Sequence, residues 1–180
     1  MYALALVISL ALIPAVAVAA DAALITPPAA QPAGYLPIPG AAVQPDKTHI
    51  YKAIFDATKI AEMPDKIVPA IEMLGIEQDA LLGSGGVPAK NLNLAIVFHG
   101  EAIDAVLNDA AYKTRHGVPN PNLGAIAALK KKGAEVLVCG QQMRIDGITP
   151  AMLSPDVTIA SDALIVLMTY QNRGYALMSF

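Results

Sequence analysis

Cys139 has the clearest capacity for chemistry, and it is the only cysteine in the 180-residue chain. It closes the apolar run 134–139, and Gly140 follows at once, so the run predicts a strand that ends on a thiol where a helix begins. Backbone N–H groups at a helix start favour a thiolate over a thiol. The position suits a nucleophile or a sulfur carrier, and it suits a small buried hydrophobic side chain equally well.

Polar residues directly follow the thiol. Gln141, Gln142 and Arg144 come within five positions of Cys139. Their side chains could stabilise a thiolate or hold an anionic ligand. They could equally be ordinary solvent-facing residues of a helix start, which is the more common case.

A second strand end carries His99 and Glu101, after the apolar run 92–98. Ligands of open parallel sheets bind beyond the carboxyl ends of the strands. If the two strands are neighbours, His99, Glu101 and the residues around Cys139 therefore line one crevice. His99 could act as a base or polarise a ligand there, although a ring that only bonds nearby backbone is the more frequent arrangement.

Known metal and nucleotide motifs do not occur in the chain. It has no HExxH, no CxxC and no closely spaced set of His and carboxylate residues, so we expect no metal and no cofactor. The glycines of segment 83–86 precede a strand, whereas phosphate-cradling glycines follow one. That segment is expected to be a plain connection.

Strands and helices alternate along the chain. We expect strands at 48–55, 92–98, 134–138, 157–160 and 174–178, and helices at 63–82 (broken or kinked at Pro69), 101–114, 122–132 and 162–172. Such alternation indicates crossover units and an α/β fold with a mostly parallel, five-stranded sheet covered on both faces.

The first 46 residues differ in composition from the rest. Residues 1–20 carry no charged side chain and end in small residues, as a secretory signal peptide does, although no Lys or Arg precedes the apolar run. An uncleaved membrane anchor is the alternative, but the stretch is barely long enough and Pro14 interrupts it. Residues 21–46 form a Pro/Ala-rich linker, and 47–180 form one domain. We therefore expect a periplasmic or otherwise exported protein, without stable membrane association if the signal is cleaved.

The charge pattern excludes nucleic acid as an expected partner. The net charge is −3, and the one basic run, 130–132, precedes Gly133 as cations at a helix C-terminus do. An exported monomer with one cysteine has no internal disulfide, which leaves a buried thiol, a bridge between chains or a reactive group.

Three stretches together resemble one known family. They are 94–100 with its His-Gly end, 128–141 with its Gly-Ala-Glu-Val strand ending on Cys139, and 161–177 with Tyr170-Gln171 and Gly174-Tyr175. In these residues the chain resembles the DsrE-like family, which includes DsrE/DsrF, TusD and YchN-like proteins. The resemblance implies a three-layer α/β/α domain and assembly into trimers or hexamers. Several members carry sulfur as a persulfide on a cysteine after this same strand, where Cys139 stands.

The chain also departs from the sulfur-relay members of that family. Those are mainly cytosolic, whereas this chain has the pattern of an exported protein, and Gly140-Gln141-Gln142 replaces their small-residue run after the thiol. The Gly-rich opening of the carriers is also missing near the first strand. Fold therefore transfers to this chain more firmly than activity does.

Two hypotheses follow. In the first, an exported DsrE-like protein handles sulfur through a transient persulfide on Cys139, with a sulfur donor or acceptor protein or a small thiol as partner, and His99 and Arg144 shape the pocket. In the second, the protein is a non-catalytic oligomeric module that binds a ligand or a partner through the same crevice, and Cys139 is structural.

Overall fold

The computed structural model describes residues 36–180. The predictions for the signal peptide and for the first part of the linker fall outside this range. Residues 36–50 form turns and irregular chain ahead of the first strand.

Five parallel strands form one sheet in the order β4-β3-β2-β1-β5, which confirms the expected five-stranded sheet. The strands are β1 (Tyr51–Ala57), β2 (Leu92–Phe98), β3 (Glu135–Cys139), β4 (Thr158–Ala160) and β5 (Ala176–Ser179). The central strand β2 has the predicted bounds, because a continuous apolar run buried on both faces is an unambiguous pattern. The first and last strands along the chain, β1 and β5, start three and two residues after their predicted starts.

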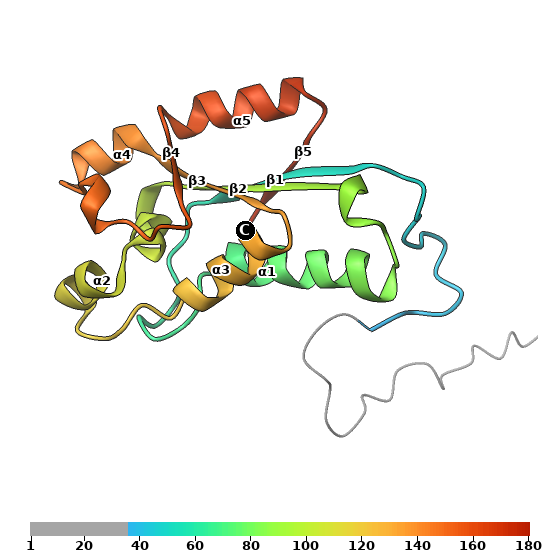
Figure 1. The fold of residues 1–180 in the computed structure, drawn as a ribbon, viewed down its shortest axis with the longest axis horizontal. Coiled ribbons are helices and arrows are strands. Elements are labelled where there is room, and N and C mark those ends of the chain that lie inside the picture. The colour runs from blue at the N-terminus through green and yellow to red at the C-terminus, as the bar shows by residue number, and fades with distance from the viewer. Residues whose placement is uncertain (1–35) are drawn as a thin grey trace, which may run out of the picture. The chain divides into compact units, whose positions relative to one another are not determined.

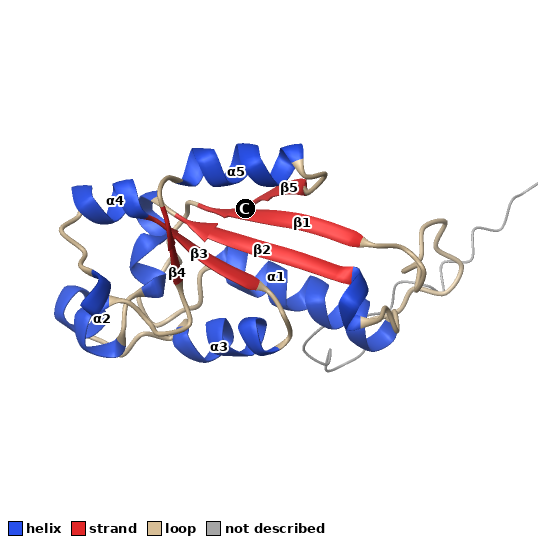
Figure 2. Ribbon diagram, turned by 45° about the horizontal axis from the view of Figure 1, so that its top comes forward, coloured by secondary structure: helices blue, strands red, loops and turns tan. Residues whose placement is uncertain are grey.

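Helices cover both faces of the sheet and complete three layers (Figure 1). On one face lie α1 (Pro69–Asp79) and α3 (Leu123–Lys131), and on the other lies α5 (Ala163–Asn172). The short helices α2 (Asp109–His116) and α4 (Gly140–Ile145) lie toward the end of the sheet where the strands finish (Figure 2).

The predicted helix 101–114 is wrong. The segment forms a 3-10 helix (Gly100–Val106), then an extended residue, Leu107, that bridges to Leu153, and only then α2. The side chain of Asn108 accepts the Ala111 N–H and caps α2, which therefore starts after the extended residue. Apolar spacing alone does not reveal this interruption, because buried residues of a 3-10 helix have a similar period.

The expected break at Pro69 is instead the first residue of α1. Proline suits that position, because the N–H that it lacks would have no partner in the first helical turn. At its other end α1 passes into a π-helical turn (Ala80–Ser84), so the Gly83–Gly86 connection is partly helical.

The sheet separates two hydrophobic clusters. The larger lies between the sheet and the layer of α1 and α3, and includes Phe55, Phe98 and Ile126. The smaller lies under α5 and includes Ile54, Val97 and Cys139. Because strand side chains alternate between faces, Leu137 and Cys139 point toward α5 while Val138 points to the opposite side.

Candidate functional site

The sulfur of Cys139 is buried and faces two backbone N–H groups. The residue is 4% exposed and packs among aliphatic side chains under α5. Its Sγ accepts hydrogen bonds from the N–H of Gln142 in α4, at 3.4 Å, and from the N–H of Ala163, the first residue of α5, at 3.3 Å. Two converging N–H groups stabilise negative charge on the sulfur.

His99 directly follows β2, the strand that neighbours β3, and is held by a carboxylate. Its Nε2 is 2.7 Å from Oδ1 of Asp56 on β1. The register pairs Phe98 with Val138, so His99, which directly follows β2, stands level with Cys139, the last residue of β3. Both residues are extended and continue the alternation toward the α5 face.

Asp56, His99 and Cys139 thus form a diagonal row near the carboxyl ends of three neighbouring strands, β1, β2 and β3, because Asp56 is level with Val97, two residues before His99. Sequence reasoning missed Asp56. The available signal was a carboxylate directly after the apolar residues Ala53, Ile54 and Phe55, which is costly to bury unless the group has a partner.

A separate shallow hollow of about 370 Å³ contains two of the predicted pocket residues, Glu101 and Gln142. It is also lined by Asp104, Arg115 and Asp146, and the Gln142 amide donates to the Asp146 carboxylate at 3.0 Å. Cys139 and His99 do not line it. The sulfur and this polar hollow are therefore two distinct features at the carboxyl ends of the strands.

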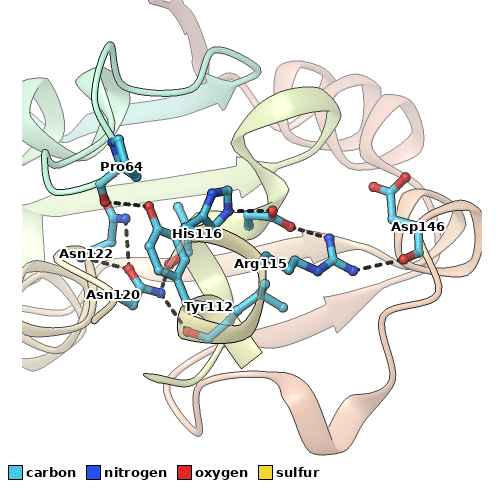
Figure 3. Close-up of polar contacts among 10 residues, drawn as sticks. Pro64, Tyr112, Arg115, His116, Asn120, Asn122 and Asp146 are labelled. Carbon is cyan, nitrogen blue, oxygen red and sulfur yellow. Dashed lines mark hydrogen bonds and ion pairs between the residues drawn. The ribbon is translucent and has the colours of Figure 1, made fainter. Parts of the chain in front are cut away.

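Ionic contacts fix the wall of the hollow (Figure 3). The Arg115 guanidinium donates to the Asp104 carboxylate at 2.7 Å and to the Asp146 carbonyl at 2.9 Å. His116 Nε2 lies 2.8 Å from the other Asp104 oxygen. These contacts connect the 3-10 segment to α2 and α4. No local sequence pattern predicts them, because they join residues that are distant in the sequence.

The two remaining predicted pocket residues, Gln141 and Arg144, have exposed side chains on α4. The structure therefore places the six predicted residues in three groups. His99 lies beside Cys139, Glu101 and Gln142 share the hollow, and Gln141 and Arg144 face solvent.

Tyr170 of α5 belongs to the same cluster as Cys139. Its hydroxyl donates to the Glu135 carboxylate at 2.7 Å. Burial, and then this hydrogen bond, raise the pKa of Tyr170 well above its ordinary value. The phenol therefore stays neutral and anchors α5 to β3.

Gly140 permits the close approach that brings the start of α5 to the sulfur. A Cβ at this position would lie 2.8 Å from the Ala160 carbonyl oxygen, which is backbone and cannot move away alone. We expect Gly140→Ala to destabilise the fold by about 1–3 kcal/mol in urea unfolding. The matched variant Gly75→Ala, in α1 with open space around it, should stabilise by about 0.5–1 kcal/mol. Equal stability of the Gly140→Ala variant and the unmodified protein would contradict the close-packing argument.

Within residues 36–180 there is no group of three or more His, Cys, Asp or Glu side chains arranged to hold a metal ion. In the same range no helix combines the length and apolarity needed to cross a membrane.

Comparison with known proteins agrees with this architecture. The model of the DsrE/DsrF-like family matches residues 49–180, which contain the whole sheet and all its helices. A search of the curated proteins returns no significant match.

Two solved structures share the fold. MTH1491, a protein of unknown function from Methanobacterium thermoautotrophicum, aligns with a TM-score of 0.54 at 15% identity, over 72% of this chain and 99% of its own. The YchN protein of E. coli aligns with a TM-score of 0.52 at 15% identity, with the same coverage. At this identity the likeness concerns the fold alone.

Proposed function

We propose that this chain, which belongs to the DsrE/DsrF-like family, carries sulfur as a persulfide on Cys139. The observation that carries the proposal is the setting of the sulfur. Two backbone N–H groups point at Sγ, and a carboxylate-bound histidine directly follows the adjacent strand. The thiolate is the nucleophilic form of cysteine, and we propose that it forms here when the thiol proton passes to His99.

Loading of Cys139 from an inorganic polysulfide needs no further oxidant or reductant, because the polysulfide supplies the sulfur atom and accepts the electron pair. His99 accepts the thiol proton, and the thiolate attacks a terminal sulfur atom of the donor. A new S–S bond forms on Cys139, and the neighbouring S–S bond of the polysulfide breaks. Its electron pair leaves with the shortened polysulfide, which takes up the proton from His99.

The burial of Cys139 sets a condition on this reaction. The donor reaches Sγ only when the starts of α4 and α5, whose N–H groups contact the sulfur, move apart. Loading should therefore be slower than the loading of an exposed thiol, and it should be limited by this local opening.

The test uses the native protein with inorganic polysulfide, followed by intact mass measurement under denaturing conditions. We expect a covalent gain of one sulfur atom per chain, and slow but measurable alkylation by iodoacetamide without denaturant. Absence of the mass gain, together with alkylation only after denaturation, would refute the proposal.

His99 is expected to speed loading as a proton acceptor. The variant His99→Gln should load about 100-fold more slowly near neutral pH, because the thiol loses its adjacent base. The deficit should shrink as the pH rises, since hydroxide then removes the proton. A rate that is lowered equally at every pH would instead show that His99 only positions the strand ends. The Asp56→Asn variant, which keeps the shape of the His99 partner, should give an intermediate rate.

Burial of the thiol also favours a second candidate function. In it the protein is a non-catalytic oligomeric module that binds a ligand or partner at the carboxyl ends of the strands. Here Cys139 is a structural residue that caps two chain segments through its sulfur. The polar hollow with Glu101, Asp104 and Arg115 would then hold the ligand. The polysulfide experiment separates the two functions.

Both candidate functions include assembly of identical chains, and the exposed apolar side chains of α5 support such an assembly. Its inner side buries Ala163, Val166 and Leu167, yet its outer side exposes Leu164, Ile165 and Met168 to 62%, 52% and 56%. A helix that is apolar on all sides is normally buried. We place the contact with a second copy on this outer face, in the trimers or hexamers that the family resemblance implies.

The assembly is testable by light scattering. The double variant Leu164→Glu with Met168→Glu should lower the mass of the assembly toward that of one chain, because it puts charges into an apolar contact. Gln171→Glu, an exposed change on the same helix, should leave the mass unaltered. An unchanged mass in the double variant would place the contact elsewhere.

Export remains part of the proposal. Its support is the uncharged, apolar composition of residues 1–20 and the Pro/Ala-rich segment after them. Sulfur exchange would then take place outside the cytoplasm, with a donor or acceptor protein or a small thiol.

A further inference from the structure

A second cavity lies on the face of the sheet opposite Cys139, at the β5 edge. It measures about 430 Å³, within the range of small-molecule sites. Its floor follows from the strand register, which aligns Leu94, Ala53 and Ala176 across β2, β1 and β5. Two adjacent alanines leave the floor low, and Glu77 and Leu81 border it from α1 and the turn that follows α1. Figure 2 shows α1 on the side of the sheet opposite α5.

Aromatic rings close both ends of this cavity. At the carboxyl end Phe55 and Phe180 stack with centroids 5.7 Å apart. At the other end His49 and Tyr51 meet edge to face at 4.8 Å. Ring faces attract cations as well as apolar groups.

The charge in the cavity is a carboxylate. Glu77 of α1 stands at the wall, is exposed, and belongs to none of the ion pairs among residues 36–180. Lys52 also borders the cavity, but its Nζ donates to the Arg173 carbonyl and lies 5.8 Å over the Tyr175 ring, which packs against the α5-side cluster. The Lys52 ammonium is therefore turned toward the other face of the sheet.

We infer that this cavity binds a small organic cation with an apolar body, such as an arylalkyl amine. The alanine floor and the aromatic ends take the apolar body, and Glu77 takes the ammonium group. The site is independent of the proposed sulfur chemistry, because it lies on the opposite face of the sheet and shares no residue with the row that contains Cys139.

The experiment titrates the full chain with 2-naphthylmethylamine and, in parallel, with the neutral 2-naphthylmethanol, followed by calorimetry and NMR of the alanine methyl groups. The amine should bind more tightly and shift the methyl signals of Ala53 and Ala176. Glu77→Gln should weaken amine binding about fivefold or more and leave alcohol binding unchanged. Glu72→Gln, on the same helix but outside the cavity, should change neither.

Ala176→Phe fills the cavity from an exposed strand position and should abolish binding of both probes. Equal affinity for amine and alcohol, or no binding at millimolar concentration, would overturn the inference. A changed assembly mass in Ala176→Phe would overturn it as well, because the β5 edge would then be a contact between copies. Sulfur loading of Cys139 should be the same in all these variants, so failure here is distinguishable from failure of the proposed function.

Discussion

Replacing Cys139 by serine is expected to abolish sulfur loading and to leave the fold intact. The serine hydroxyl is close in size to the thiol and can accept the same two N–H groups, from Gln142 and Ala163. It is not a nucleophile toward polysulfide sulfur, because an alcohol at neutral pH is almost wholly protonated. The measurement is intact mass after polysulfide treatment, with circular dichroism and urea unfolding as the check on folding.

The chain offers no second cysteine that could load in its place. A Cys139→Ser protein that still gained one covalent sulfur atom would therefore remove the carrier proposal altogether. A protein that lost loading because it had unfolded would be recognised from its denaturation curve. Alkylation of the unmodified protein remains informative in that case, because it reports access to the thiol directly.

The variant Asn120→Ala is expected to lose about 3–5 kcal/mol of folding free energy, the largest stability effect outside the hydrophobic core. The Asn120 amide donates to the carbonyls of Ala105 and Leu107, at 3.0 and 2.7 Å, and its oxygen accepts two hydrogen bonds from Asn122. Asn122 in turn accepts the Val68 N–H (Figure 3 shows the two amides). Both residues are buried, at 7% and 1% exposure, so removal of one amide leaves several polar groups without partners or water.

Asn108→Ala provides the matched comparison. Asn108 also bonds backbone on both sides of its amide, but its cap of α2 is near the surface, where water can replace the lost partner. We expect a cost of about 1 kcal/mol for that variant. Urea unfolding measures the loss of folding free energy in both variants. Equal losses would mean that water reaches the hydrogen-bond network of Asn120. Asn120→Asp should cost at least as much as Asn120→Ala, because it places a buried carboxylate oxygen against the carbonyl oxygens of Ala105 and Leu107.

These amides show why part of the candidate site escaped prediction. In sequence, the segment Asn120-Pro121-Asn122 is typical of a turn and a helix cap, which are local structures. Apart from the bonds between these two residues, their partners are 13 to 54 positions away in the chain, in and just after the 3-10 segment and just before α1. The same holds for Arg115, His116 and Asp104, whose pairing depends on how α2 packs.

The apolar pattern by itself determined that this chain forms an α/β domain, because buried parallel strands and amphipathic helices have different hydrophobic periods. The run 92–98 specified β2 to the residue, and the strand that ends on Cys139 was also evident. The family followed from the same segments, since the His-Gly and Cys-Gly strand ends are local features.

Only the tertiary structure decided what surrounds the thiol. Strand order made β2 the neighbour of β3, and register then set His99 beside Cys139 and Asp56 within reach of His99. Packing of α5 buried the sulfur and aimed the Ala163 N–H at it. Side-chain period specifies which face a residue occupies, but the neighbours on that face come from other strands and helices. Their positions depend on the summed packing of the whole domain, and no local sequence pattern records them.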